Sequence, residues 1–267
     1  MTIARPPAVA GMFYPGRPGE LMATVDQLLA EAPAIAMPQP KVLIVPHAGY
    51  IYSGATAAQA YATLAPWRST IRRVVLLGPT HRVAVNGLAL PKTDVFSTPL
   101  GNVRLDHAAM AELADLPQVV FSDHVHAEEH SLEVHLPFLQ RVLDDFMLVP
   151  LAVGHAAPEA VAEVIERLWG GPETLIIISS DLSHFMSYAA ANRVDRDTCQ
   201  HILQLDTHIR TEQACGAYPL NGLLLVASRR GLVPRMLQHC NSGDTAGDKQ
   251  RVVGYAAFTF QQGEHHG

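Results

Sequence analysis

Short apolar runs alternate with amphipathic or alanine-rich segments along most of this chain. Lys41–Pro46, Arg73–Leu77 and Leu175–Ser179 are rich in β-branched and aliphatic residues, which is typical of strands buried on both faces. Further strands are expected at Val85–Leu90, Val119–Phe121, Phe146–Val153 and Val252–Phe260. Helices are expected at Pro18–Ala30, Gly54–Leu64, Ser131–Leu143, Ala157–Leu168, Tyr188–Leu205 and Leu220–Arg229.

This alternation predicts an α/β fold: one domain over residues 1–267, with a central, mostly parallel or mixed sheet and helices on both faces. The sequence has no internal repeat and no low-complexity tract, and the proline-rich segment Ala30–Pro40 is expected to be a loop. In open α/β sheets, ligands bind at the carboxyl ends of the strands. The residues that follow each buried strand are therefore the first place to look for chemistry.

Composition narrows the classes of protein that fit. Of the 267 residues, 48% are hydrophobic and 16% are charged, so a large core is available. The net charge is −6 and basic residues occur at most in pairs, which argues against nucleic-acid and membrane partners. No apolar run reaches the roughly 18 residues of a membrane span, and no signal peptide is evident. Three scattered cysteines fit a reducing compartment, so we expect a cytoplasmic protein.

Histidine is the residue type that stands out, with 14 copies. His47 follows the first buried strand in VPHAGY, His81 follows the second in GPTH, and His184 follows the third in SSDLSH. If these strands are parallel, the three side chains converge on one crevice. Histidine is the commonest metal ligand and titrates near neutral pH. The pattern predicts a metal or acid/base cluster, whereas one such histidine alone could equally cap a helix or satisfy a backbone group.

A second polar cluster runs from Glu128 to His135. On a regular helix His130 and His135 would point about 140° apart, so both could not bind one metal ion. One of His130, Glu133 and His135 is a candidate for the rim of the site. The alternative is a solvated helix start, whose acidic residues favour the positive end of the helix dipole.

The three cysteines have different expected roles. Cys199, within a helix, and Cys215, in the tripeptide Ala-Cys-Gly, are expected to be structural. Cys240 precedes a polar, glycine-rich loop; its thiolate would be a good soft metal ligand, although a lone cysteine is more often a small buried apolar residue. The sequence has no GxGxxG, Walker A, GxSxG or CxxC motif. The kinds of chemistry that these motifs mark therefore have no support in the sequence.

The chain resembles the Memo family, whose microbial members are known as AmmeMemoRadiSam system protein B. The resemblance runs nearly end to end and rests on motifs in the expected order: AGMFYP at 10–15, PHAGY at 46–50, GPTH at 78–81, EHSLEVHLP at 129–137, SSDLSH at 179–184 and CG at 215–216. The family's fold is similar to that of the class III non-haem-iron extradiol dioxygenases. The resemblance therefore implies a class III extradiol dioxygenase-like fold.

The resemblance also implies roles for individual residues. In the dioxygenases two histidines and a glutamate hold Fe(II), and a further histidine acts as acid/base. His47 and His81 match the two histidine ligands, and His184 matches the acid/base histidine, with Asp181 beside it. Cys240 falls where Memo proteins carry a metal-binding cysteine and the dioxygenases carry the glutamate. A thiolate in that place would change the redox tuning and expose the sulfur to oxidation.

The first hypothesis is a Memo-type protein that binds a transition metal, iron or copper before zinc, through His47, His81 and Cys240. Asp181 and His184 would transfer protons, and the metal would serve redox chemistry or metal handling. The resemblance also implies partners: a small molecule or peptide, and proteins of the same operon that are AMMECR-like or belong to the radical SAM class.

Two other functions stay open. One is a metal-dependent oxidoreductase of the extradiol dioxygenase type, for which only Asp244 or Glu133 could supply the carboxylate ligand. The other is a non-catalytic module whose crevice binds a protein or peptide.

Overall fold

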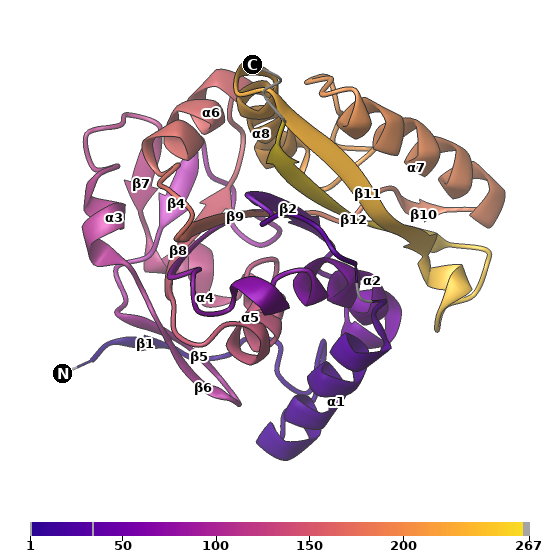
Figure 1. Cartoon of the computed structure of the whole chain (residues 1–267), viewed down its shortest axis with the longest axis horizontal. Coiled ribbons are helices and arrows are strands. Elements are labelled where there is room, and N and C mark those ends of the chain that lie inside the picture. The colour runs from indigo at the N-terminus through magenta and orange to yellow at the C-terminus, as the bar shows by residue number, and fades with distance from the viewer. Residues whose placement is uncertain (1, 34, 264–267) are drawn as a thin grey trace.

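A computed structural model describes residues 2–33 and 35–263 of the chain (Figure 1). The strands are β1 Ala4–Arg5, β2 Val42–Val45, β3 Arg73–Pro79, β4 Leu88–Leu90, β5 Val95–Thr98, β6 Gly101–Arg104, β7 Val119–Phe121, β8 Met147–Val153, β9 Thr174–Ser179, β10 His184–Met186, β11 Leu232–Asn241 and β12 Val252–Gln262. The α-helices are α1 Pro18–Glu31, α2 Tyr50–Ala62, α3 His107–Ala111, α4 Asp123–Ala127, α5 Leu136–Val142, α6 Pro158–Arg167, α7 Tyr188–Leu203 and α8 Ala217–Arg229. Short 3₁₀ turns lie at Ala65–Trp67, Glu133–His135 and Ser242–Asp244.

The main sheet has the strand order β10-β12-β2-β9-β3-β8-β4-β7, and β11 pairs with β12. Its centre, β2-β9-β3-β8, is parallel: Ile176 of β9 lies between Val42 of β2 and Val75 of β3. β12 and β4 run antiparallel to this centre. The carboxyl ends of β2, β9 and β3 therefore meet at one edge of the sheet. A smaller sheet, β1-β5-β6, lies apart from it.

Helices cover both faces of the main sheet (Figure 1). α1, α2 and α5 pack on one another below it in this view, while α6, α7 and α8 lie above it. The predicted α/β fold with a mixed sheet and helices on both faces is confirmed; the likeness to the dioxygenase fold stays a prediction. Within the described part of the chain, no helix combines the length and apolar character needed to cross a bilayer.

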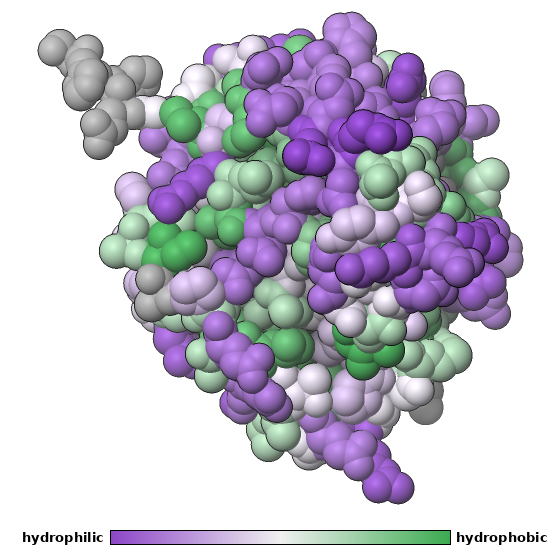
Figure 2. All heavy atoms as spheres, turned by 90° about the vertical axis from the view of Figure 1, so that its right-hand side faces the viewer, coloured by the Kyte–Doolittle hydropathy of each residue, from purple (hydrophilic) through white to green (hydrophobic). Residues whose placement is uncertain are grey.

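The elements form where the sequence pattern favours them. All four residues of β2 and all six of β9 are buried, as expected for strands covered on both faces. α1 and α6 each begin at a proline, whose missing N–H has no intrahelical partner to lose there. Most of the buried apolar side chains form a hydrophobic cluster that contains residues from the sheet and from helices on both faces. On the flank shown in Figure 2, hydrophilic and hydrophobic side chains are interspersed.

Some boundaries differ from the predicted ones for clear physical reasons. The helix expected at Ser131–Leu143 is instead the 3₁₀ turn Glu133–His135 followed by α5, because Pro137 has no amide to continue a helix from upstream. β11 was not predicted, since buried and exposed positions along it follow no strict alternation. The β5–β6 hairpin was also missed; its turn uses Gly101 at a φ of +119°, a conformation that favours glycine.

Candidate metal centre

The carboxyl ends of β2, β9 and β3 open on a cavity of about 800 Å³. His47 follows β2, Asp181 follows β9 and His81 follows β3, and all three side chains line the cavity. His130 and His184 line it as well. The structure thus brings the histidines that follow three buried strands to one place.

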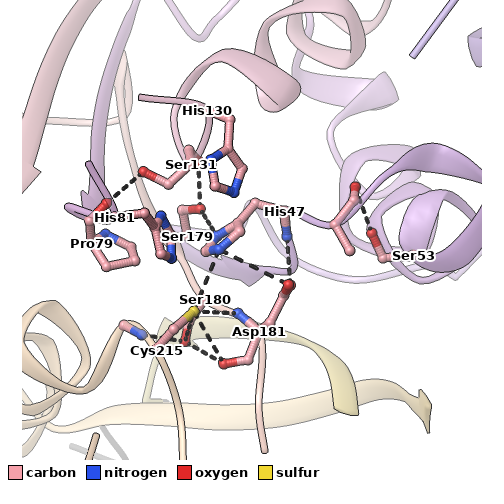
Figure 3. A network of polar contacts seen from close by, with 12 residues as sticks. His47, Ser53, Pro79, His81, His130, Ser131, Ser179, Ser180, Asp181 and Cys215 are labelled. Atoms are coloured by element: carbon pink, nitrogen blue, oxygen red, sulfur yellow. Dashed lines mark hydrogen bonds and ion pairs between the residues drawn. The ribbon is translucent and has the colours of Figure 1, made fainter. Parts of the chain in front are cut away.

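Three imidazoles form a tight cluster in this cavity (Figure 3). One ring nitrogen each from His47, His81 and His130 lies within 4.8 Å of the other two. Metal–nitrogen bonds are about 2.0–2.1 Å long, so small side-chain movements would let one ion bind all three. Among the residues that the structure describes, no other trio of His, Cys, Asp or Glu side chains meets this distance. The donor set therefore fits a single transition-metal ion.

Glu129 holds two of these histidines in place. Its carboxylate is 2% exposed; Oε1 accepts hydrogen bonds from His81 Nδ1 and from the amides of His130 and Ser131, each 2.9 Å long. Oε2 accepts from the amide of His81 at 2.5 Å. Burial alone would raise the pKa of Glu129, but these hydrogen bonds outweigh it and lower the pKa to about 2. The charged carboxylate accepts a hydrogen bond from His81 Nδ1–H. Nε2 is therefore the nitrogen of His81 that a metal would bind.

His47 is fully enclosed and is held from two sides. Its amide donates to Asp181 Oδ1 at 2.8 Å, and its Nδ1 lies 2.7 Å from Ser179 Oγ. On the opposite side of the ring, Nε2 lies 3.4 Å from Cys215 Sγ and 3.9 Å from Asp181 Oδ2. Burial, and then the neighbouring histidines, lower the pKa of His47 well below its usual range. The ring is therefore neutral at pH 7, the form in which imidazole binds metals.

His130 completes the cluster from the loop before α5. Its ring stacks on His81 with centroids 4.6 Å apart and contacts Phe13 at 4.7 Å. Burial, followed by the proximity of His81, lowers the pKa of His130 to about 4. This ring is also neutral near pH 7 and can act as a ligand.

Two further groups in the cavity can hold or release a proton. Burial raises the pKa of Asp181 to about 7, although hydrogen bonds from the His47 and Ala48 amides oppose the rise. His184 Nδ1 donates to the carbonyl of Leu182 at 2.8 Å, which leaves its Nε2 as an acceptor. Burial lowers the pKa of His184 as well. Both side chains line the cavity, so they are placed to exchange protons with a bound molecule.

Comparison with known proteins identifies the family. The family described as Memo-like protein matches residues 5–259. This chain belongs to the Memo-like family. MEMO1 family proteins of Ignicoccus hospitalis and Methanosarcina mazei are 35% and 36% identical to it, over 97% and 96% of this chain and 99% of each relative. A solved structure, an uncharacterized protein of Escherichia coli K12, shares 12% identity with a TM-score of 0.49 and covers 83% of this chain and 99% of its own.

The resemblance to Memo proteins that the motifs indicated is thus confirmed, but the structure does not bring the expected cysteine into the cluster. Cys240 lies on β11, opposite Tyr255 of β12, and its Sγ is 3.1 Å from Thr56 Oγ1. β12 separates β11 from β2, the strand that leads to His47. Burial raises the pKa of the Cys240 thiol. Cys215, which was expected to be structural, is the cysteine that contacts His47.

The residues from Glu128 to His135 have different roles in this Memo-family structure. Of the three rim candidates His130, Glu133 and His135, only His130 belongs to the histidine cluster. Glu133 is fully buried and accepts hydrogen bonds from Arg5, the amides of Ala8 and Val9, and the hydroxyl of Tyr14. The interpretation as a solvated helix start is wrong for Glu129 and Glu133, because backbone amides replace water around both carboxylates, together with the His81 ring at Glu129 and the Arg5 guanidinium at Glu133.

Gly78 permits the close approach that places His130. A Cβ at this position would lie 2.8 Å from Leu132 Cδ2 and 3.0 Å from Ser131 Oγ, so a side chain there would push the loop away from β3. Sequence reasoning did not predict the side chains that contact the histidine ligands: Glu129, Ser179 and Cys215. The positions of Glu129, beside a rim candidate, and of Ser179, at a strand end, were the available signals. Their contacts, however, join segments far apart in the sequence.

Asp195, in α7 next to the segment that carries His184, is expected to make the stability of the fold depend on pH. It is fully buried, and burial raises its pKa from 3.8 to about 6, despite hydrogen bonds from Ser183. The folded protein keeps a proton on Asp195 between these values that the unfolded chain has lost, so stability falls as pH rises through this window. Asp195→Asn should therefore raise the free energy of unfolding at pH 7 by about 2–3 kcal/mol, measured by urea denaturation.

Asp197→Asn, on an exposed residue of the same helix, is the matched control. It should leave the decline in stability between pH 4 and pH 6 unchanged, whereas Asp195→Asn should reduce it. Equal pH slopes in the two variants would show that Asp195 is not the group responsible.

Proposed function

We propose that this Memo-family protein binds one transition-metal ion through His47, His81 and His130, and presents it to a small molecule in the cavity. The observation that carries the proposal is the convergence of three imidazoles, with one ring nitrogen of each within 4.8 Å of the other two. Three imidazole ligands leave at least one position of a four-coordinate ion for a substrate. Asp181 and His184 are the groups that would hold or move a proton beside it.

The donor set narrows the choice of metal. Imidazole ligands suit iron, copper and zinc, whereas magnesium and calcium prefer oxygen ligands. The bound metal would supply Lewis-acid or redox chemistry, or would be cargo in metal handling. Iron and copper, with zinc as a further option, are thus the metals to test.

Ring cleavage of the extradiol type has weaker support. Its third ligand would have to be a carboxylate, and Glu133 and Asp244 were the candidates. Glu133 binds Arg5 and the N-terminal segment, and Asp244 accepts from the Asn241 amide and the Tyr188 hydroxyl. Within the described part of the chain, neither carboxylate belongs to the cluster of His47, His81 and His130. Oxygen uptake by the Fe(II)-loaded protein with a panel of catechols would revive this alternative.

The proposal is tested by metal analysis of protein loaded separately with Fe(II), Cu(II) and Zn(II) and then desalted. His47→Ala, His81→Ala and His130→Ala should each lower the metal-to-protein ratio, because each removes a ligand. Cys240→Ser should keep the wild-type ratio, since its Sγ lies outside the cluster. His208→Ala, on an exposed histidine, serves as the control for general loss of imidazole.

The same experiment can contradict the assignment in two ways. If Cys240→Ser loses metal while His130→Ala keeps it, the third ligand is the thiolate that the resemblance implies. If His47→Ala, His81→Ala and His130→Ala all keep the wild-type ratio, the metal lies elsewhere and the proposal is wrong.

A further inference from the structure

Ser179, the last residue of β9, contacts His47 of the three-histidine cluster and lies at the centre of a buried hydrogen-bond network (Figure 3). Its Oγ is 2.6 Å from the carbonyl of Ser131, 2.7 Å from His47 Nδ1 and 2.8 Å from His135 Nε2. All four residues are at most 2% exposed, and the three contacts equal the one donor and two acceptor sites of a hydroxyl. The positions of the protons can therefore be deduced from the partners alone.

The hydroxyl of Ser179 has one proton and two lone pairs. The Ser131 carbonyl can only accept, so the Ser179 hydroxyl donates to it. The two imidazole nitrogens that contact the same oxygen must then both donate N–H groups. His47 consequently carries its proton on Nδ1, and His135 carries its proton on Nε2.

The far nitrogens of both rings agree with this deduction. His135 Nδ1 lies 2.8 Å from the hydroxyl of Tyr61, which is fully buried and donates to it. His47 Nε2, which this deduction leaves without a proton, lies 3.4 Å from Cys215 Sγ, whose S–H group can donate to it.

We infer that Ser179 is a positioning residue of the metal site: with His135 and Tyr61 behind it, it holds His47 in the tautomer that leaves Nε2 unprotonated, as a metal ligand requires. This inference rests on the proposed function only in its consequence for metal binding. It gives His135 a role although its ring does not reach the cluster. It also distinguishes the two strand-end ligands, because His81 is supported by the Glu129 carboxylate and His47 by a neutral hydroxyl.

The tautomers can be read directly in the full-length, metal-free protein. Two-bond ¹H–¹⁵N correlation spectra of ¹⁵N-histidine-labelled protein distinguish Nδ1–H from Nε2–H imidazoles. We expect His47 as Nδ1–H and His135 as Nε2–H. Finding His47 protonated on Nε2 would overturn the inference, whether or not the protein binds metal. Failure of the proposed function and failure of this inference are thus separate results.

Ser179→Ala should leave His47 in a mixture of tautomers and weaken Co(II) binding by about 10- to 100-fold, the usual effect of removing a hydrogen-bond partner behind a ligand. Ser53→Ala is the matched control, because the Ser53 hydroxyl is buried near His47 but donates to the Ala48 carbonyl outside the network. It should change neither the tautomer nor the affinity. A Ser179→Ala protein that keeps a single His47 tautomer and wild-type affinity would overturn the inference.

Tyr61→Phe provides a test that does not depend on the folding of Ser179→Ala. It removes the hydrogen bond to His135 Nδ1 and should shift the ¹⁵N resonance of that nitrogen, while Ser179 keeps His135 as Nε2–H and His47 as Nδ1–H. An unchanged His135 spectrum would contradict the part of the network assigned to Tyr61.

Discussion

Replacing Arg5 by methionine is expected to lower the free energy of unfolding by about 3–5 kcal/mol, because it leaves a buried carboxylate without its charged partner. The Arg5 guanidinium contacts Glu133, and the two side chains are 4% and 0% exposed. Arg5 also donates to the carbonyls of His126 and Glu129. The substitution thus removes the partner of Glu133 and frees two carbonyls of the loop that leads to His130.

The stability of this variant can be measured by urea denaturation of the metal-free protein. Arg17→Met is the control: Arg17 is 84% exposed and pairs with Glu20 on the protein surface, so its loss should cost less than about 0.5 kcal/mol. Arg5→Met/Glu133→Met should recover part of the lost stability, because it removes the unpaired charge. An Arg5→Met protein as stable as Arg17→Met would mean that the buried pair is not needed.

Glu129→Gln is expected to weaken metal binding by about 100-fold, the upper end of the effect of losing a partner behind a metal ligand. All four hydrogen bonds to this side chain come from N–H donors, on His81, His130 and Ser131. A glutamine amide would turn its own NH₂ group toward at least one of these donors in either orientation. Two ligands would therefore lose their support at once.

Titration calorimetry with Zn(II) measures this loss. Glu128→Gln is the matched control, since the adjacent glutamate is exposed and makes the same change of charge. Glu128→Gln should bind like the wild type. Equal affinities for the two variants would show that Glu129 does not support the ligands.

The sequence was sufficient to place His47 and His81, because both follow apolar runs that form strands of the parallel sheet centre, one on each side of β9. Strand-end position depends only on local pattern and on a general rule of α/β folds. His130 could not be placed this way, since it lies in a loop whose path depends on Gly78 and on Arg5. These contacts join residues far apart in the chain, which hydrophobic periodicity does not report.

The same limit explains the two cysteines. Cys240 was favoured by resemblance and Cys215 was set aside, because nothing local to either residue shows which strand or helix lies beside it. The unpredicted strand β11 carries Cys240 to the far side of β12, whereas the segment just before α8 brings Cys215 next to His47. Helix and strand positions were thus predicted well in the sheet centre and poorly at its periphery.

The pairing of Arg5 with Glu133 also constrains when the metal centre can assemble during synthesis. The two residues are 128 positions apart, so Arg5 leaves the ribosome long before its partner exists. Ser179 and Cys215 emerge later still, and both contact His47. A nascent chain that already exposes His47 and His81 therefore still lacks the groups that orient them. At the proposed site, metal met at that stage would find histidines that are not yet oriented, so selective loading would have to wait until most of the chain has been translated.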